Sequence, residues 1–372
     1  MKNVPGITPS KLYPDEIGIQ QVGYMYSPNY QITNKILRAI GIIEAAKEVI
    51  ENSPLVPAWE AKFREEALIR TVHYGTHIEG NDLNYSEAEK VLAGAKVVGK
   101  ERDIQEVLNY RNVLKFIESY NNGEFTEDAV KKIHELTVTK ILPDEMVGSY
   151  RKTQVVVKNS QTGEVTFRPP PSIEIPFLMT DFVAWLNSVN TDVVHTAIKA
   201  GVAHFEIVRI HPFLDGNGRV GRAIATLVLF REGYDVKKFF SLEEHYDREP
   251  MQYYDSLQSV GQQSGNMTGW LEYFTEGLAI ELTRIKEKVK SISTDLKLKK
   301  SLGGQQLALS ERQIKIVEFV QENGFLQNKS FFELFPMISE DTVLRELKDL
   351  IKKGIVRKEG TTKGVRYVLL TT

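Results

Sequence analysis

The stretch HPFLDGNGRVGR, residues 211–222, holds more chemically active side chains than any other part of this 372-residue chain. It combines an imidazole, a carboxylate, an asparagine, two guanidinium groups and three glycines. The apolar run AIATLVLF follows directly and stops shortly before Gly233, a pattern typical of a buried helix. The sequence therefore predicts a loop that opens a core helix, with Gly216 to Gly218 at the helix N-terminus.

A helix N-terminus attracts anions, because its first N–H groups lack intrahelical acceptors and its end of the dipole is positive. Arg219 and Arg222 are three residues apart, so they share one face of the predicted helix. Their planar guanidinium groups match phosphate oxygens. Asp215 suits a magnesium ion that phosphate oxygens help to hold. The local chemistry predicts a site for nucleotide phosphates and a divalent cation.

Two other interpretations fit the motif less well. GNGRVG matches the dinucleotide fingerprint GxGxxG, yet no acidic residue ends a second strand about 20 residues further on. His204 and His211 can be read as metal ligands, but their i, i+7 spacing without a third nearby histidine is poor for zinc. We expect His204 to be a core histidine.

Residues 211–222 resemble the signature of the Fic family of protein adenylyltransferases, which is His-Pro-Phe, any residue, an acid, Gly-Asn-Gly-Arg, two residues and Arg. The chain matches at every defined position. The resemblance implies transfer of AMP from ATP to a Tyr, Thr or Ser hydroxyl of a protein. His211 is then the general base on the attacking hydroxyl, since an imidazole titrates near neutral pH. Asp215 is the implied magnesium ligand.

The resemblance also implies the nucleotide contacts. Gly216, Asn217 and Gly218 are expected to hold phosphates, and Arg219 and Arg222 to neutralise the β and γ groups. The implied nucleotide-binding set is Gly216, Asn217, Gly218, Arg219, Val220, Gly221 and Arg222. Family members place a tyrosine in the base pocket, for which Tyr253 and Tyr254 are the candidates. From the residues alone both tyrosines also suit a helical core, so the adenine contact stays open.

Glu79 is expected just before the stop Gly80–Asn81 of a helix that begins near Pro57. A carboxylate is unusual there, because the C-terminal end of the dipole disfavours negative charge. Many Fic proteins have an inhibitory helix with the motif Ser or Thr, three residues, Glu, then Gly or Asn. Its Glu pairs with the last Arg of the signature, so the resemblance implies that Glu79 pairs with Arg222. Gly75 occupies the Ser/Thr position in this chain, with Thr76 one residue later.

The composition is that of an ordinary folded protein, with 42% hydrophobic and 26% charged residues and a formal net charge of -2. This balance gives no overall attraction to nucleic acid or to anionic membranes. The lack of cysteine excludes disulfides, thiolate metal sites and a Cys nucleophile. The first residues lack the apolar core of a signal peptide, and no later apolar run approaches the roughly 20 residues of a membrane span. We expect a cytoplasmic protein.

Residues 153–168 change from helical to strand periodicity, where TQVVVKN and EVTFR flank SQTG. This pattern predicts a β-hairpin before the proline run 169–171. In the Fic family such a hairpin pairs with the backbone of the protein to be modified, a form of strand addition. Elsewhere Ser86 with Glu89 predicts a helix capping box.

Residues 306–372 predict three short helices and two strands. Ser310 with Gln313 caps the first helix, Ser339 caps the third, and IVRK and VRYVLL flank EGTTKG. The pattern resembles a winged helix, a helix-turn-helix variant that often reads DNA. The third helix opens with Glu340 and Asp341, and the module has 11 basic and 9 acidic residues. DNA phosphates would repel that opening, so DNA contact and protein contact both stay open.

The predicted fold is mainly α: a Fic-type helical bundle with a small hairpin flap, followed by a C-terminal winged helix-turn-helix domain. The predicted segments are an N-terminal arm and helical region at 1–110, a catalytic core at 111–290, a linker at 291–305 and the winged-helix module at 306–372. The first 30 or so residues contain four prolines and are expected to be an extended arm or disordered.

The implied cofactors are ATP and Mg²⁺, and the implied partner is a target protein with a hydroxyl side chain, which includes this protein itself. A homodimer is compatible with the sequence, and no membrane contact is expected. Two other functions stay open. One is a Fic transferase with another donor, of UMP, phosphate or phosphocholine. The other is a winged-helix DNA-binding regulator whose Fic domain senses nucleotide.

Overall fold

The computed structural model describes residues 26–53, 55, 57–120, 123–158, 163, 165–189, 193–234, 236–292, 309–336, 338–360 and 365–370. The arm predicted for residues 1–30 lies almost entirely outside these residues, as does most of the linker predicted at 291–305. The described chain is mainly helical, with two small antiparallel sheets of two strands each. The prediction of a mainly α fold with a small hairpin is confirmed.

Up to residue 292, the described part of the chain contains helices, three short 3₁₀ turns and one hairpin. The helices are α1 (Asn34–Asn52), α2 (Pro57–His77), α3 (Tyr85–Leu92), α4 (Glu101–Ser119), α5 (Glu127–Val138), α6 (Ile175–Ser188), α7 (Thr196–Ile210), α8 (Asn217–Arg231), α9 (Leu242–Arg248), α10 (Pro250–Gln262) and α11 (Thr268–Ile292). The turns are η2 (Asp144–Met146), η3 (Ser172–Glu174) and η4 (Val236–Lys238), and the strands are β1 (Val157–Lys158) and β2 (Val165–Phe167).

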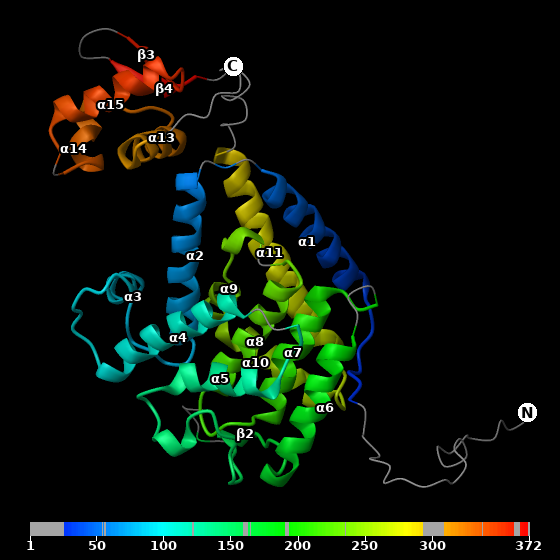
Figure 1. Cartoon of the computed structure of the whole chain (residues 1–372). Helices are drawn as coiled ribbons and strands as arrows, with labels where there is room; N and C mark the ends of the chain where they lie inside the picture. The colour runs from blue at the N-terminus through cyan, green and yellow to red at the C-terminus, as the bar shows by residue number, and fades with distance from the viewer. Residues whose placement is uncertain are drawn as a thin grey trace, which may run out of the picture.

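Helices α7 and α8 form the centre of the bundle (Figure 1). Both are buried around most of their circumference, as expected for helices that are apolar on nearly every face. Helices α4 and α5 pack against α8, and α11 packs against α7. The loop 211–216 joins α7 to α8, so the signature stretch is held by the two most buried helices of the fold.

One hydrophobic cluster extends from Ile36 in α1 to Val289 in α11 and also includes Ile314, in the helix Glu311–Asn323. Helix α1 lies along α11, and α2 packs against α9 (Figure 1). The boundary predicted at residue 110 falls inside α4, and buried residues on both sides of it belong to this cluster. The N-terminal helices therefore share the core of the bundle, and this places the end of α2 close to α8.

Helix α3 begins earlier than its sequence suggests. The side chain of Asn84 accepts the N–H of Glu87 at 3.0 Å, and the Glu87 carboxylate accepts the N–H of Asn84 at 2.9 Å. The capping box predicted from Ser86 and Glu89 is wrong by two residues, because Asn84 starts the helix and leaves Ser86 in its first turn.

The predicted hairpin is present but its paired part is short. Val157 pairs with Phe167 and Lys158 pairs with Val165 in antiparallel register. The tip, residues 159–162 and 164, lies outside the described residues. The side chain of Gln154 donates to the carbonyl of Pro169 at 2.9 Å, which closes the base of the hairpin.

The C-terminal unit begins after residue 308 and has its own hydrophobic cluster. Its elements are α13 (Glu311–Asn323), η5 (Asn328–Ser330), α14 (Phe331–Leu334), α15 (Glu340–Lys352), β3 (Val356–Glu359) and β4 (Arg366–Leu369), with β3 antiparallel to β4. The capping box of Ser310 and Gln313 is confirmed. An ion pair between Lys62 of α2 and Glu318 of α13 links the unit to the bundle.

The elements of this unit follow the order predicted for a winged helix. The assignment of the unit as a winged helix is a proposal. Among the helices that the structure describes, none combines the length and the apolar character needed to cross a bilayer.

Candidate active site

His211 caps the C-terminus of α7 in a left-handed conformation, with φ of 50°. Its Nδ1 lies 3.2 Å from the carbonyl oxygen of Val208. A carbonyl only accepts, so Nδ1 carries the proton in this contact and Nε2 keeps its lone pair. Burial is the main cause that lowers the pKa of His211, and the nearby charge of Arg151 lowers it further. The imidazole is thus prepared to accept a proton.

Arg151, just before the hairpin, holds the loop that carries His211. Its Nε donates to the carbonyl of His211 at 2.8 Å, and its two terminal nitrogens donate to the carbonyls of Thr153 at 3.0 Å and Pro170 at 2.7 Å. Its backbone N–H donates to the carbonyl of Pro212 at 2.9 Å. The residue is 5% exposed, and it lies outside the signature at residues 211–222. This buried cation therefore ties both ends of the hairpin to the histidine.

His134 of α5 braces the other side of the loop. The N–H of Gly148 donates to its Nδ1 at 3.0 Å, so its Nε2 carries the proton that faces the carbonyl of Asp215 at 3.2 Å. The ring stacks on Phe213 with a centroid distance of 3.8 Å and an interplanar angle of 2°. Burial lowers the pKa of His134 to about 4. It is a neutral structural histidine.

The N-terminus of α8 is built from glycine and asparagine. Gly216 has φ of 80°, and a Cβ there would lie 3.1 Å from Val138, so glycine is required by conformation and by space. The Asn217 side chain bonds both the N–H and the carbonyl of Phe213, each at 2.9 Å. The group of Asn217 that can bind an anion is therefore its backbone N–H. This N–H has no intrahelical acceptor, because it lies in the first turn of the helix.

Asp215 lies at the mouth of this helix end, with its side chain 41% exposed. One oxygen accepts the N–H of Gly216 at 2.6 Å, and the other lies 3.2 Å from a terminal nitrogen of Arg102. Arg219 is buried and lies 3.2 Å from Glu106 and 3.8 Å from Asp215. Arg102 and Glu106 of α4 were not predicted, because nothing in their helical surroundings distinguishes them from ordinary surface charges.

The implied magnesium fits this corner of the site. Mg²⁺ is usually held by one or two carboxylates together with phosphate oxygens and waters, and Asp215 presents one exposed carboxylate beside an anion-binding helix end. Within the described chain, no group of three or more His, Cys, Asp or Glu residues can hold a metal by itself. The residues are suited to a magnesium ion that arrives with a nucleotide.

Glu79 lies over the N-terminus of α8. Its Oε1 is 2.8 Å from Arg222 Nη2, and the same nitrogen donates to the carbonyl of Gly75 at 2.9 Å. A Cβ on Gly218 would lie 2.4 Å from Glu79 Oε1, so the carboxylate is in close contact with the glycine of the helix end. The contact implied for Glu79 and Arg222 is present, and the carboxylate lies where the helix end would receive an anion.

Gly75 stands where the inhibitory motif of many Fic proteins has Ser or Thr, and the glycine has a structural reason. A Cβ on Gly75 would lie 2.5 Å from the Tyr110 ring and 3.1 Å from Glu243. The Tyr110 hydroxyl donates to Glu243 at 3.0 Å. Burial raises the pKa of Glu243, while the charge of Arg222 and the bond from Tyr110 lower it. The bond between Tyr110 and Glu243 therefore takes up the space that a serine or threonine side chain would need.

The two adjacent tyrosines of α10 lie in different surroundings. Tyr253 is 1% exposed, and its hydroxyl lies 2.9 Å from Nε2 of His204. Burial raises the pKa of Tyr253 to about 12 and lowers that of His204 well below its ordinary value. Tyr254 is 39% exposed, and its hydroxyl donates to the carbonyl of Ile78 at 3.3 Å. Only Tyr254 keeps a ring surface that a base can reach.

The remaining predicted residues pack into the core. Val220 is fully buried, and a Cβ on Gly221 would lie 3.1 Å from Val208 and 3.2 Å from His204. These residues let α8 approach α7 closely. His204 lies among aromatic rings, including that of Trp270, as expected for a core histidine.

Residues 124–229 match the family model described as Fic/DOC family. The chain is 29% identical over 221 residues to a protein adenylyltransferase Fic from Culex quinquefasciatus, covering 58% of this chain and 41% of that protein. It is 32% identical over 199 residues to a protein of the same name from Aedes aegypti, covering 52% and 37%. The chain thus spans less than half the length of these relatives.

Two solved structures show the same fold. A crystal structure of a Fic family protein from Desulfovibrio desulfuricans G20 has a TM-score of 0.64 and 23% identity, covering 93% of this chain and 99% of that one. Fic-1 from C. elegans, residues 134–508, has a TM-score of 0.58 and 22% identity, covering 68% and 74%. The match over residues 124–229 makes this part of the chain similar to the Fic/DOC family. The chain is a distant homologue of protein adenylyltransferases Fic.

Proposed function

We propose that this protein is a protein adenylyltransferase, which transfers AMP from ATP to a Tyr, Thr or Ser hydroxyl of a protein, and that Glu79 holds it in an inhibited state. One observation carries the proposal: the Glu79 carboxylate rests on Arg222 and Gly218, at the helix end where nucleotide phosphates would bind. The adenylyltransferases among its relatives support the reaction class.

His211 takes the proton in the proposed reaction. Nε2 of His211 accepts the proton of the target hydroxyl while the hydroxyl oxygen bonds to the α-phosphorus of ATP. The bond from the α-phosphorus to the bridging oxygen breaks, and pyrophosphate leaves with that electron pair. The bond from Nδ1 to Val208 and the clamp of Arg151 fix the direction of the lone pair, and such positioned bases contribute about 10²–10⁴-fold to the rate.

The end of α8 and its arginines hold the phosphates in this proposal. Backbone N–H groups from Asn217 to Arg219 point out of the helix end, and Arg219 and Arg222 supply the positive charge. Asp215 would hold the magnesium ion, which when bound neutralises phosphate charge. Tyr254 lines the base pocket, and the hairpin β1–β2 pairs with the backbone of the target.

Inhibition follows from competition for Arg222. The carboxylate of Glu79 and a terminal phosphate are both anions, so one helix end cannot hold both at close range. Burial opposes the charge of Arg222, but Glu79 and the neighbouring tyrosines Tyr253, Tyr110 and Tyr254 together outweigh burial, and the pKa of the guanidinium is raised well above its ordinary value. A cation this buried needs an anion beside it, so Glu79 leaves only when phosphate replaces it.

Labelling with radioactive ATP tests the proposal. We expect Glu79→Gly to raise modification of the protein itself by roughly tenfold or more, which corresponds to removal of about 1.4 kcal/mol of competition. Glu79→Gly with His211→Ala should label roughly 10²–10⁴-fold more slowly than Glu79→Gly alone and keep the unfolding temperature of Glu79→Gly. Equal labelling by the two variants would reject His211 as the base.

The same variant distinguishes the donors. Parallel reactions of the Glu79→Gly protein with ATP, UTP and CDP-choline, analysed by intact mass, should add AMP alone. Transfer of UMP, phosphate or phosphocholine instead would show that AMP is not the transferred group. The residues assigned to the site would stay the same. Mass spectrometry after incubation with host lysate and ATP would then identify the target.

A second role is favoured for the C-terminal unit, which we propose to be a winged helix that contacts DNA. Arg345, Lys348 and Lys352 lie at i, i+3 and i+7 on the exposed face of α15. Among the residues that the structure describes, no carboxylate pairs with any of the three. Unpaired cations along one face of such a helix are what phosphate contacts require. Contact with a protein is the alternative, because Glu340 and Asp341 open the helix.

A further inference from the structure

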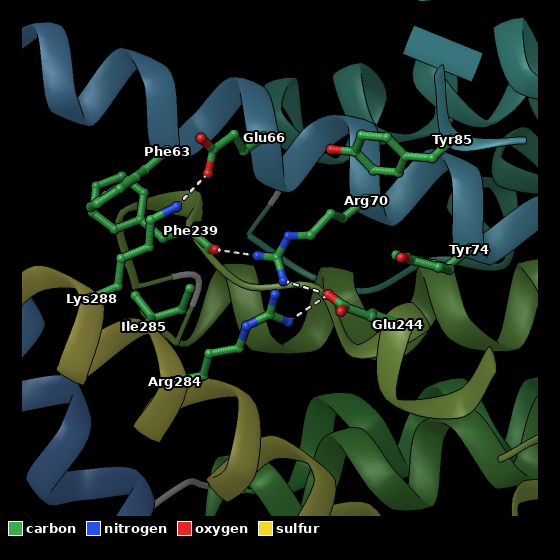
Figure 2. Close-up of a pocket in the computed structure, with 10 residues that line it drawn as sticks. All are labelled: Phe63, Glu66, Arg70, Tyr74, Tyr85, Phe239, Glu244, Arg284, Ile285 and Lys288. Carbon is green, nitrogen blue, oxygen red and sulfur yellow. Dashed lines mark hydrogen bonds and ion pairs between the residues drawn. The ribbon is translucent and has the colours of Figure 1, made fainter. Parts of the chain in front are cut away.

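A cavity of about 340 Å³ lies between α2, α9 and α11, and its lining includes none of residues 211–222. Its size falls in the range of about 300–1,000 Å³ that small-molecule sites occupy. Figure 2 shows the side chains that line it. They are Phe63, Glu66, Arg70 and Tyr74 of α2, Tyr85 of α3, Phe239, Glu244 of α9, and Arg284, Ile285 and Lys288 of α11.

Arg70 forms a fixed floor in this cavity. Its terminal nitrogens lie 2.7 Å from Glu244, 3.3 Å from Glu281 and 3.0 Å from the carbonyl of Phe239. The Arg70 side chain is only 12% exposed, so mainly these protein contacts hold it. Arg284 lies 2.7 Å from the same oxygen of Glu244 (Figure 2). The cation at the floor is therefore preorganised and needs no rearrangement to face a ligand.

Two phenol hydroxyls point into the cavity without a partner. Figure 2 shows the hydroxyl of Tyr74 directed toward the guanidinium of Arg70 and that of Tyr85 directed toward the space between Arg70 and Glu66. Neither hydroxyl has a hydrogen-bond partner among the described residues. Phe63 and Phe239 form an apolar wall with a centroid distance of 5.1 Å. Aromatic walls with a few convergent polar groups are typical of ligand sites.

The mouth of the cavity favours an anionic head on the ligand. Arg284 and Lys288 stand there with side chains 48% and 42% exposed. Lys288 pairs with Glu66 at 2.5 Å. Ion pairs at this exposure are weak, so a phosphate or carboxylate can take the place of a protein carboxylate. The two free phenols are donors that such a head accepts from.

The cavity and the active site share two stretches of chain. Tyr74 lines the cavity, and the next residue, Gly75, holds Arg222 through its carbonyl. Glu244 lines the cavity, and its neighbour Glu243 accepts the hydroxyl of Tyr110. The N–H of Ile78, next to Glu79, donates to the carbonyl of Tyr74 at 3.1 Å. A ligand that fixes Tyr74 therefore fixes the turn that carries the inhibitory carboxylate.

We propose that this cavity is a second ligand site, that it binds a small ring-bearing organic anion, and that the bound ligand stabilises the state in which Glu79 rests on Arg222. The cavity has this shape in that state, and a ligand shifts an equilibrium toward the state it fits. The regulatory part rests on the proposed transferase function, whereas the binding site does not depend on it.

Binding to the full chain is tested first, with phenyl phosphate as the probe. We expect saturable binding by calorimetry and a rise in unfolding temperature. Inorganic phosphate, which has the head without the ring, and benzamidine, which has a ring with a cation, should each bind at least about tenfold more weakly. Equal binding of phenyl phosphate and inorganic phosphate would overturn the requirement for a ring. Tighter binding of benzamidine than of phenyl phosphate would overturn the preference for an anion.

The double variant Tyr74→Phe/Tyr85→Phe locates the site. It removes both free donors and keeps both rings, and it costs the fold no contact seen in the described chain. We expect the Kd for phenyl phosphate to rise by roughly tenfold. Tyr30→Phe, which lies outside both sites, is the matched control and should keep the Kd of the parent protein. Unchanged binding by the double variant would reject this cavity.

Hydrogen exchange tests the coupling without any assay of activity. Phenyl phosphate should slow exchange of the amides at 78–80 in the parent protein and leave those of α15 unchanged. Binding without slower exchange there would overturn the coupling. If AMP transfer is then observed, phenyl phosphate should reduce it in the parent protein and not in Glu79→Gly. Absence of all transfer would reject the proposed function and leave the binding and exchange results intact.

Discussion

Arg151 holds the backbone that carries His211. A guanidinium supplies several N–H groups in a fixed plane, and here they reach the carbonyls of His211, Thr153 and Pro170. A lysine at this place would keep the charge, but its three N–H groups start from one nitrogen and do not span the separation of the three carbonyls as the guanidinium does. Substitutions of Arg151 can therefore separate the effect of the guanidinium's shape on His211 from the effect of its charge.

We predict that Arg151→Met moves the acidic limb of the pH profile of kcat/KM to higher pH. A general base acts when neutral, so activity is lost as the pH falls through its pKa. The pKa of His211 is lowered mainly by burial and also by Arg151, while Glu79 and Asp215 raise it. Removing the charge of Arg151 raises the pKa of His211. As the pH falls, the variant should therefore lose activity at a higher pH than the parent protein. Profiles measured in the Glu79→Gly background check this.

Arg151→Lys is the matched control for that experiment. It should lower kcat through loss of positioning and leave the acidic limb where the parent has it. An acidic limb that shifts equally in the Lys and Met variants would contradict an electrostatic role of Arg151 on His211.

At the scale of elements, the end of α2 is positioned by its packing against α4 and α9. Tyr110 of α4 lies against Gly75, and its hydroxyl bonds Glu243 of α9. The carbonyl of Gly75 then reaches Arg222 of α8. The position of Glu79 is thus the result of close contact between four helices, for which the missing Cβ of Gly75 is a condition.

We predict that Gly75→Ala lowers the free energy of unfolding by about 1–3 kcal/mol, the usual effect of overpacking. The new Cβ would lie 2.5 Å from the Tyr110 ring. The free-energy cost of this overlap exceeds the gain of about 0.5–1 kcal/mol that alanine in place of glycine brings to a helix. Gly41→Ala in α1 is the control, because a Cβ there meets nothing within 4 Å, and it should stabilise the protein. Denaturant unfolding of both variants measures the two effects, and a more stable Gly75→Ala would refute the contact.

At the scale of the whole molecule, the chain joins a bundle with one large hydrophobic cluster to a C-terminal unit with its own. The formal net charge of -2 gives the molecule no general affinity for nucleic acid. Any DNA binding must therefore come from the local arrangement of charge, of which the face of α15 is the strongest case.

We predict that the full chain binds duplex DNA in a salt-dependent manner and that replacing Arg345, Lys348 and Lys352 by Gln weakens this binding. Each lost phosphate contact should reduce the slope of log K against log salt by about 0.9. Fluorescence anisotropy over a salt series measures both quantities.

Three exposed lysines of the bundle serve as the control, since Lys90→Gln/Lys96→Gln/Lys115→Gln changes the net charge equally. The two triple variants should differ in affinity for DNA. If both weaken binding to the same degree, or if the parent does not bind, the exposed face of α15 serves a protein contact instead.

Much of the fold follows from short-range patterns. The run 211–222, the apolar helices and the hairpin at 153–168 are recognised from residue types within a few positions of one another. The capping box at Ser310 and Gln313 is another example. At α3 the same reasoning chose Ser86 over Asn84, because two overlapping cap patterns compete and only the pairing with Glu87 distinguishes them.

The sequence by itself determined the identity of the signature, the order of the elements and the candidate base, because these depend on local spacing and residue chemistry. Tertiary structure alone decided that Arg151 clamps His211, that Tyr253 is buried while Tyr254 is exposed, and that α2, α9 and α11 enclose a cavity. These contacts join residues far apart in the chain. Nothing in the local pattern of either partner specifies them, since they exist only once the helices are packed.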